Sequence, residues 1–168
     1  MKTKITPLMI TEIAVIAALY AVLTVAFQPL SYGAVQVRFS EALMLLCCFR
    51  KRWCVGLSVG CMIANLFSGM ALDFIFGTLA TVIAAVLMYL IRKPVPASFI
   101  PAIVNGLIIG AELKFFMGEP YWFSFLGVAA GELVAVVVAG LPVLWALMRS
   151  PAAKKIICGS AHTGAEAA

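Results

Sequence analysis

The chain consists of long apolar runs separated by short polar breaks. The breaks include Arg50-Lys51-Arg52, Arg92-Lys93-Pro94 and Gly118-Glu119-Pro120. Apolar runs of about 20 residues are typical of helices that cross a lipid bilayer. The pattern therefore predicts an all-α fold, an integral membrane bundle of six transmembrane helices. The six predicted segments are Leu8–Phe27, Ser40–Phe49, Trp53–Phe67, Met70–Ile91, Ser98–Phe116 and Trp122–Met148.

Composition supports a membrane protein. Hydrophobic residues make up 64% of the 168 residues and charged residues 11%, and the mean hydropathy is +1.11. A soluble domain of this size does not need so much apolar surface. We expect residues 1–150 to form a single transmembrane domain and residues 151–168 a polar, disordered cytoplasmic tail. A net charge of +5 predicts no nucleic-acid partner here, because the basic residues lie between apolar segments.

The basic residues predict the orientation in the cell membrane. If all six segments cross the bilayer, one side carries ten of the twelve lysines and arginines, and Arg38 and Lys114 lie on the other side. If the second and third segments did not cross, Arg50-Lys51-Arg52 would change sides and the asymmetry would nearly vanish. Because basic residues favour the cytoplasmic side, we expect a multi-pass protein with both termini in the cytoplasm. The ten are Lys2, Lys4, Arg50, Lys51, Arg52, Arg92, Lys93, Arg149, Lys154 and Lys155.

The second segment is too short to cross the bilayer as an ordinary α-helix. Its ten residues, Ser40–Phe49, span only about 15 Å as an α-helix, against a hydrocarbon core of about 30 Å. Non-helical backbone cannot face lipid, but it can lie inside a bundle or line a cavity. We therefore expect the loop from Gln28 to Phe39, between the first two helices, to dip into the outer face. This loop and the start of the next helix place Arg38 and Glu41 beside the short segment.

Polar residues collect in the outer half of the predicted bundle. Acidic residues outnumber basic ones there, and Asn65 lies at the outer end of the third segment. Asn105, near the middle of the fifth segment, and Glu12, near the inner end of the first, are the exceptions. Ionisable groups in a membrane are costly and usually face a cavity or a partner, so we predict an outward-facing binding pocket. Excess carboxylates favour a ligand that is cationic or rich in N–H donors. The acids are Glu41, Asp73, Glu112, Glu119 and Glu132, and the bases are Arg38 and Lys114.

Each of these polar residues has a simpler interpretation when taken alone. An isolated Asn or Glu often only ties two helices together, Asp73 suits the first turn of a helix, and Lys114 and Glu119 suit a solvated loop. Aromatic residues at the same depth can stack on a flat ring or form an interfacial belt. These are Tyr32, Phe39, Tyr121, Trp122 and Phe123.

The sequence predicts neither an enzyme nor a cofactor or metal site. The single histidine, His162, lies in the polar tail, and the five cysteines contain no CxxC pair. These residues provide no cluster for metal binding and no nucleophile–base pair in the membrane. The GxxxxGK[ST] motif for nucleotide triphosphates is also absent. A transporter of this size must then use an ion gradient or the energy of a partner protein.

The first helix carries four small residues in two AxxxA patterns, Ala14/Ala18 and Ala17/Ala21. Small residues allow another helix to pack closely. That helix can belong to the same bundle or to a partner, and these residues alone favour internal packing.

Several longer runs resemble one known family. The chain contains, in order, FQPLSYGAVQVRFSEALMLL, CMIANLFSG, LDFIFGTLAT, NGLIIGAEL, GEL and GLP. Over roughly residues 10–148 it resembles the QueT family, substrate-binding S components of energy-coupling factor (ECF) transporters. The resemblance implies uptake of queuosine precursors, which are 7-deazaguanine bases. It also implies docking on an ECF module, a transmembrane coupling protein plus two ATPases. One departure is Lys114, where relatives are expected to have a histidine.

The resemblance changes the expected role of the first helix and supplies a ligand for the pocket. In S components an AxxxA pattern on this helix meets the coupling protein, which maps onto Ala14, Ala17, Ala18 and Ala21. A 7-deazaguanine has a flat ring, a guanine-like N–H edge and, in its aminomethyl form, a cation. The carboxylates expected to bind it are Glu41, Glu112 and Glu132, without individual assignment. The other expected site residues are Arg38, Phe39, Asn65, Asp73 and Asn105.

Two alternatives remain from the sequence. One is an S component of the same architecture for another flat, vitamin-like ligand. The other is a stand-alone proton-coupled carrier, in which buried acids relay protons. Glu12 is the only acid in the inner half, and the chain shows no internal repeat, which disfavours the carrier.

Overall fold

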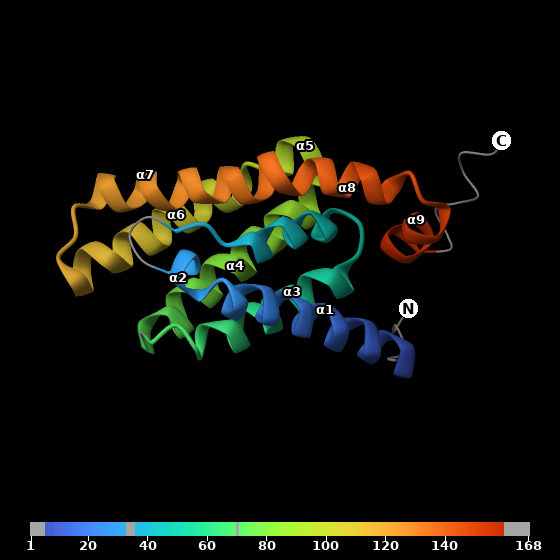
Figure 1. The fold of residues 1–168 in the computed structure, drawn as a ribbon, viewed down its shortest axis with the longest axis horizontal. Helices are drawn as coiled ribbons and strands as arrows, with labels where there is room; N and C mark the ends of the chain where they lie inside the picture. Colours follow the sequence, from blue (N-terminus) through green and yellow to red (C-terminus); the bar gives the residue numbers. More distant parts are fainter. Residues whose placement is uncertain (1–5, 33–35, 70, 160–168) are drawn as a thin grey trace.

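The chain forms an all-helical bundle, and the described residues contain no strand (Figure 1). The computed structural model describes residues 6–32, 36–69 and 71–159. In the labels used here, η marks a 3₁₀-helix or a π-helix. The elements are α1 Pro7–Ala26, α2 Gln28–Ser31, η1 Phe39–Cys48, α3 Lys51–Asn65, α4 Ala71–Ile91, α5 Pro94–Ala97, α6 Ile100–Glu112, η2 Leu113–Met117, α7 Tyr121–Glu132, η3 Leu133–Gly140, α8 Leu141–Met148 and α9 Pro151–Cys158.

The prediction of an all-α membrane protein is confirmed at this level. Among the described residues, four helical runs are long and apolar enough to cross a membrane: Pro7–Ala26, Ala71–Ile91, Pro94–Met117 and Tyr121–Met148. The second and third predicted segments are helical as well, but η1 has 10 residues and α3 has 15. By length and composition, the described residues therefore contain four candidate membrane spans.

The helix η1 differs from the expected α-helix. It is a 3₁₀-helix over all 10 residues, which is long for this type. The larger rise of a 3₁₀-helix, about 2.0 Å per residue, extends ten residues to about 20 Å instead of about 15 Å. The tighter helix thus makes up part of the length that the segment lacks.

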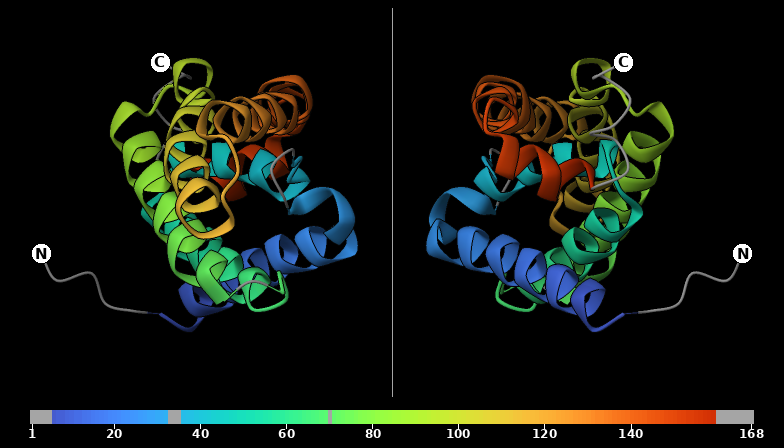
Figure 2. Two further views of the ribbon diagram at one scale, coloured as in Figure 1. Left: turned by 90° about the vertical axis from the view of Figure 1, so that its left-hand side faces the viewer. Right: turned by 90° about the vertical axis from the view of Figure 1, so that its right-hand side faces the viewer.

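η1 lies at the centre of the bundle. It contacts α1, α3, α4 and η3, and the end-on views show it enclosed by the longer helices (Figure 2). α1 packs closely on α3, because Gly60 has no side chain: a Cβ there would lie 3.0 Å from the Cα of Ala17. Small residues at such a crossing allow the two backbones to approach.

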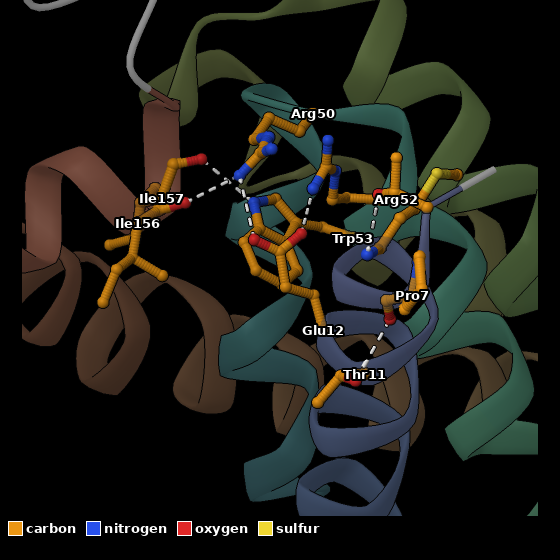
Figure 3. Close-up of polar contacts among 10 residues, drawn as sticks. Pro7, Thr11, Glu12, Arg50, Arg52, Trp53, Ile156 and Ile157 are labelled. Atoms are coloured by element: carbon orange, nitrogen blue, oxygen red, sulfur yellow. Dashed lines mark hydrogen bonds and ion pairs between the residues drawn. The ribbon is translucent and has the colours of Figure 1, made fainter. Parts of the chain in front are cut away.

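The basic residues Arg50 and Arg52, at the junction of η1 and α3, make polar contacts at one end of the bundle. Arg52 bonds to Glu12 of α1, and Arg50 lies 3.6 Å from the same carboxylate (Figure 3). Arg50 also donates to the Ile156 carbonyl at 3.0 Å, and Trp53 donates its indole N–H to the Ile157 carbonyl at 3.0 Å. These bonds attach the last turn of α9 to the bundle.

The expectation of a wholly disordered tail is wrong for its first part, because residues 151–158 form α9. Ser150 in extended conformation and Pro151 in the first turn suit a helix start. Arg50 and Trp53 satisfy carbonyls that the helix end leaves without partners. Residues 160–168, including His162, lie outside the described residues.

Candidate ligand-binding site

Seven polar residues predicted for the site lie together inside the bundle, and each is at most 3% exposed. They come from the start of η1, the end of α3, the first turn of α4, and the buried faces of α6 and α7. We call this group the polar cluster: Arg38, Glu41, Asn65, Asp73, Asn105, Glu112 and Glu132.

Arg38 is the only basic residue of the polar cluster. Its Nε donates to the Ser31 carbonyl at 2.9 Å, and its guanidinium lies 5.1 Å from the centre of the Tyr32 ring. It interacts electrostatically with Glu41 and Glu132, yet makes no ion pair within 4.0 Å among the described residues. Its Nη2 has no hydrogen-bond partner there. A buried guanidinium with an unused N–H is available to a ligand.

Tyr32 holds the Arg38 end of the cluster in place. Its hydroxyl donates to the Ala64 carbonyl at 2.8 Å. Burial raises the pKa of this hydroxyl to about 12, so it remains a donor at neutral pH. The ring therefore stays fixed beside the Arg38 guanidinium.

Four members of the cluster have one side-chain polar atom hydrogen-bonded and another without a partner among the described residues. Glu132 accepts from Asn105 Nδ2 at 2.7 Å, and Glu41 accepts from the Tyr20 hydroxyl. The second carboxylate oxygens, Glu132 Oε2 and Glu41 Oε2, have no partner among the described residues, and neither has Asn105 Oδ1. Asn65 follows the same pattern: its Nδ2 donates to Thr78 at 3.2 Å, and its Oδ1 is free.

Glu112 and Asp73 form an acidic pair across α6 and α4. Their carboxyl groups interact electrostatically, although no cation lies within ion-pair distance of either in the described chain. Both oxygens of Glu112 and Oδ2 of Asp73 lack hydrogen-bond partners in the part of the chain that the structure describes. Two close carboxylates repel one another unless a cation or a proton lies between them.

Glu112 also borders an apolar groove of about 540 Å³ between α4 and the α6–η2 run. Glu112 is the one ionisable residue in its lining. The π-helix η2 begins directly after Glu112, and η3 begins directly after Glu132. π-Helical turns are frequent at functional sites, and here each follows an acid of the polar cluster.

Among the described residues of this region, buried acceptors without a hydrogen-bond partner outnumber buried donors without one. The free acceptors are oxygens of Glu41, Asn65, Asp73, Asn105, Glu112 and Glu132; the free N–H donors belong to Gln36 and Arg38, and the Ser124 hydroxyl can act as either. Buried polar atoms are normally bonded, because an unpaired one is costly. The arrangement therefore suits a ligand with several N–H groups and a smaller number of acceptors.

Gln36 and Ser124 were not among the residues predicted for the site. The sequence contains a pattern that could have pointed to each of them. In extended backbone, residues two apart point the same way, which pairs Gln36 with Arg38. Ser124 lies eight residues before Glu132 on the same helix, and so on the same face. Neither residue type is unusual enough by itself to mark a site.

Gly131 determines how closely the Gln36–Arg38 segment approaches α7. A Cβ at Gly131 would overlap the carbonyl oxygen of Gln36. We expect Gly131→Ala to reduce the free energy of unfolding by about 1–3 kcal/mol, because backbone must move to make room, and to weaken ligand binding. Thermal unfolding and ligand titration measure both effects. Gly106→Ala is the control with a smaller expected loss, since its nearest neighbours, at 3.1 Å, are Phe125 ring atoms. Equal losses in the two variants would contradict this role.

The remaining predicted residues lie elsewhere. Phe39 is partly buried and packs edge-on against Phe27, with 5.2 Å between ring centres. Trp122 is 69% exposed, as expected of an interfacial belt residue. Lys114 is exposed, with its Nζ 5.7 Å from the centre of the Phe115 ring, so it lies outside the polar cluster.

The four alanines of the first helix lie on two different faces. Ala17 and Ala21 are buried, and Ala17 packs against Gly60 of α3. Their role is packing within the bundle. Ala14 and Ala18 are exposed, so they are the pair that a partner helix can reach.

Comparison with known proteins identifies the family. A family model described as QueT transporter matches residues 10–149. The chain belongs to the QueT transporter family. It is 31% identical over 145 residues to a protein of Lactococcus lactis subsp. cremoris (strain MG1363) named queuosine precursor transporter QueT, covering 77% of this chain and 86% of that relative. No solved structure matches. This QueT family member is thus a transporter with several apolar helices able to span a membrane.

Proposed function

We propose that this chain is the membrane-embedded, substrate-binding subunit of an ATP-driven ECF importer that captures a queuosine precursor, a 7-deazaguanine base. The supporting observation is the excess of free, buried carboxylate and amide oxygens around a single guanidinium. In the membrane, α3 and η1 complete six crossings, both termini are cytoplasmic, and the loop before η1 lies in the outer face. Ligand then enters from outside.

The N–H edge of the ring fits the Glu132 side of the polar cluster. A guanine-like edge presents two parallel N–H groups, which carboxylate and amide oxygens accept. The side chains of Glu132 and Asn105 are hydrogen-bonded to each other. Their remaining oxygens, Glu132 Oε2 and Asn105 Oδ1, have no partner among the described residues. The N–H groups of Arg38 and Gln36 are free to donate to the ring carbonyl and ring nitrogen. The donors and acceptors of the site therefore complement those of the ring.

The aminomethyl group fits the Glu112–Asp73 pair. A protonated amine between the two carboxylates replaces their mutual repulsion with two attractive, charge-assisted bonds. No protein cation occupies that position among the described residues. This assignment gives the acidic pair a role separate from ring recognition.

Ligand binding by the purified chain tests the proposal. We expect 7-deazaguanine and its aminomethyl derivative to bind the chain in nanodiscs without ATP or an ion gradient, with a dissociation constant below about 1 μM. Titration calorimetry measures it. Tight binding of only an unrelated flat vitamin would overturn the choice of ligand.

Docking on the ECF module is assigned to the exposed face of α1. Ala18→Leu is expected to leave ligand affinity unchanged and to lower cellular uptake about tenfold, because a larger side chain blocks close helix packing. Uptake of labelled ligand and titration of the purified chain measure the two effects. The matched control is Ala146→Leu, at an exposed position of α8. This variant should transport the ligand normally. Normal uptake by Ala18→Leu would remove this face from the docking surface.

The acidic pair also supports a second candidate, a stand-alone proton-coupled carrier. Two facing carboxylates can share a proton, and the carboxyl groups of Glu112 and Asp73 interact electrostatically across two helices. Reconstitution of the chain alone in liposomes separates the two functions. Uptake driven by a pH gradient without a partner supports the carrier, whereas binding without uptake supports the ECF subunit.

A further inference from the structure

The inward face of α1 makes two consecutive contacts with the start of η1. Tyr20 and Thr24 lie one helical turn apart and are 0% and 1% exposed. The Tyr20 hydroxyl donates to Glu41 Oε1, and the Thr24 and Ser40 hydroxyl oxygens are 2.6 Å apart. One turn of α1 thus contacts two neighbouring residues of η1, one of which belongs to the polar cluster.

The direction of the second contact follows from the number of hydrogens. The Thr24 hydroxyl donates to the Tyr20 carbonyl at 2.9 Å. A threonine hydroxyl has one hydrogen but can also accept, so Ser40 donates to Thr24. The chain of bonds from Ser40 through Thr24 to the Tyr20 backbone therefore fixes the helix turn that carries the Tyr20 side chain.

The Tyr20 side chain is also confined by packing. Gly60 of α3 leaves room for it, since a Cβ on Gly60 would lie 2.8 Å from the Cβ of Tyr20. Tyr20 therefore has little freedom to turn away from Glu41. Because Glu41 Oε1 is bound and Oε2 is free, the hydroxyl determines where the free oxygen points.

We propose that Tyr20 is a positioning residue for ligand binding: it orients the Glu41 carboxylate, and the Thr24–Ser40 contact holds the two helices in register. This inference rests on the proposed function, because it takes Glu41 as a ligand-binding residue. It assigns α1 a role in ligand affinity through its inward face, which is distinct from the exposed Ala14/Ala18 face.

The test is Tyr20→Phe, which keeps the ring and removes the hydroxyl. We expect its affinity for 7-deazaguanine to fall about tenfold, because the Glu41 carboxyl group loses the buried hydrogen bond that orients it. Tyr89→Phe is the matched control: the Tyr89 hydroxyl bonds Arg92 at 3.0 Å on an exposed surface, and its removal should not change affinity.

A double-mutant cycle distinguishes positioning from packing. If Tyr20 acts through Glu41, Tyr20→Phe should change affinity less than about twofold when it is added to Glu41→Gln. An equal loss in both backgrounds would mean that Tyr20 acts by packing alone, and would overturn the proposal. Equal binding by wild type and Tyr20→Phe would also overturn it. Failure of the wild type itself to bind 7-deazaguanine would instead count against the proposed function.

Thr24 provides a second, independent pair of variants, which decides the question if Tyr20→Phe does not fold. Thr24→Val removes the hydroxyl at nearly constant shape and is expected to lower affinity about threefold. Thr24→Ser keeps the hydroxyl and should bind like wild type. Wild-type affinity in Thr24→Val would contradict the proposed contact between α1 and η1.

Discussion

Glu112→Gln is expected to lower the affinity for the aminomethyl derivative of 7-deazaguanine about 100-fold, because a charge-assisted bond to the amine becomes a neutral one. Both carboxylate oxygens of Glu112 are buried without a hydrogen-bond partner among the described residues, and the Asp73 carboxyl group interacts with Glu112 electrostatically. Unsubstituted 7-deazaguanine has no amine, so its affinity should change less than about threefold. Titration calorimetry with the two ligands measures the difference.

Two control variants sharpen this comparison. Glu119→Gln changes an acid in the loop between η2 and α7, outside the polar cluster, and should alter neither affinity. Glu132→Gln should weaken both ligands alike, because both contain the ring edge assigned to Glu132. If Glu112→Gln weakened the two ligands equally, the acidic pair would not be the amine site.

Arg38→Met is expected to reduce the free energy of unfolding by about 3–5 kcal/mol. This is the usual cost of removing a buried charge and leaving the opposite charges around it uncompensated. Arg38 is 2% exposed and is the one cation among Glu41, Asp73, Glu112 and Glu132. Without it, the repulsion among these buried acids is uncompensated. The midpoint of thermal unfolding in detergent should fall by about 10 °C.

Lys114→Met is the matched control for this prediction, because Lys114 is exposed. It removes the other predicted base of the outer half, and its unfolding midpoint should match wild type. A similar midpoint for Arg38→Met and wild type would show that the acids do not depend on Arg38 for stability.

Much of the fold was predictable because helix formation in a membrane is a local property. Apolar length and polar breaks indicated each helical run, and the short second segment was recognised by its length. Its 3₁₀ geometry was not, since the choice between a 3₁₀-helix and an α-helix depends on tertiary contacts as well as on local sequence, and η1 contacts α1, α3, α4 and η3. The ordering of residues 151–158 was missed for a similar reason: α9 is held by Arg50 and Trp53, which are about 100 residues away in the chain.

The polar cluster was predictable as a set, because ionisable side chains within apolar membrane segments are costly and usually face a cavity or a partner. The separate roles of its members were not. Glu112, Glu132 and Glu41 are equivalent by residue type, but two of them have a bound oxygen and one has none. Gln36 and Ser124 belong to the same region through contacts that no local pattern marks.

The sequence by itself determined that this protein is an apolar helical bundle that carries acids, amides and one arginine within its apolar segments. Helical periodicity and hydropathy depend on neighbouring residues only. Tertiary structure alone decided which atoms are free for a ligand and which alanines of α1 face outward. Those properties depend on how each helix is rotated against its neighbours, and close contacts at Gly60 and Gly131 set that rotation.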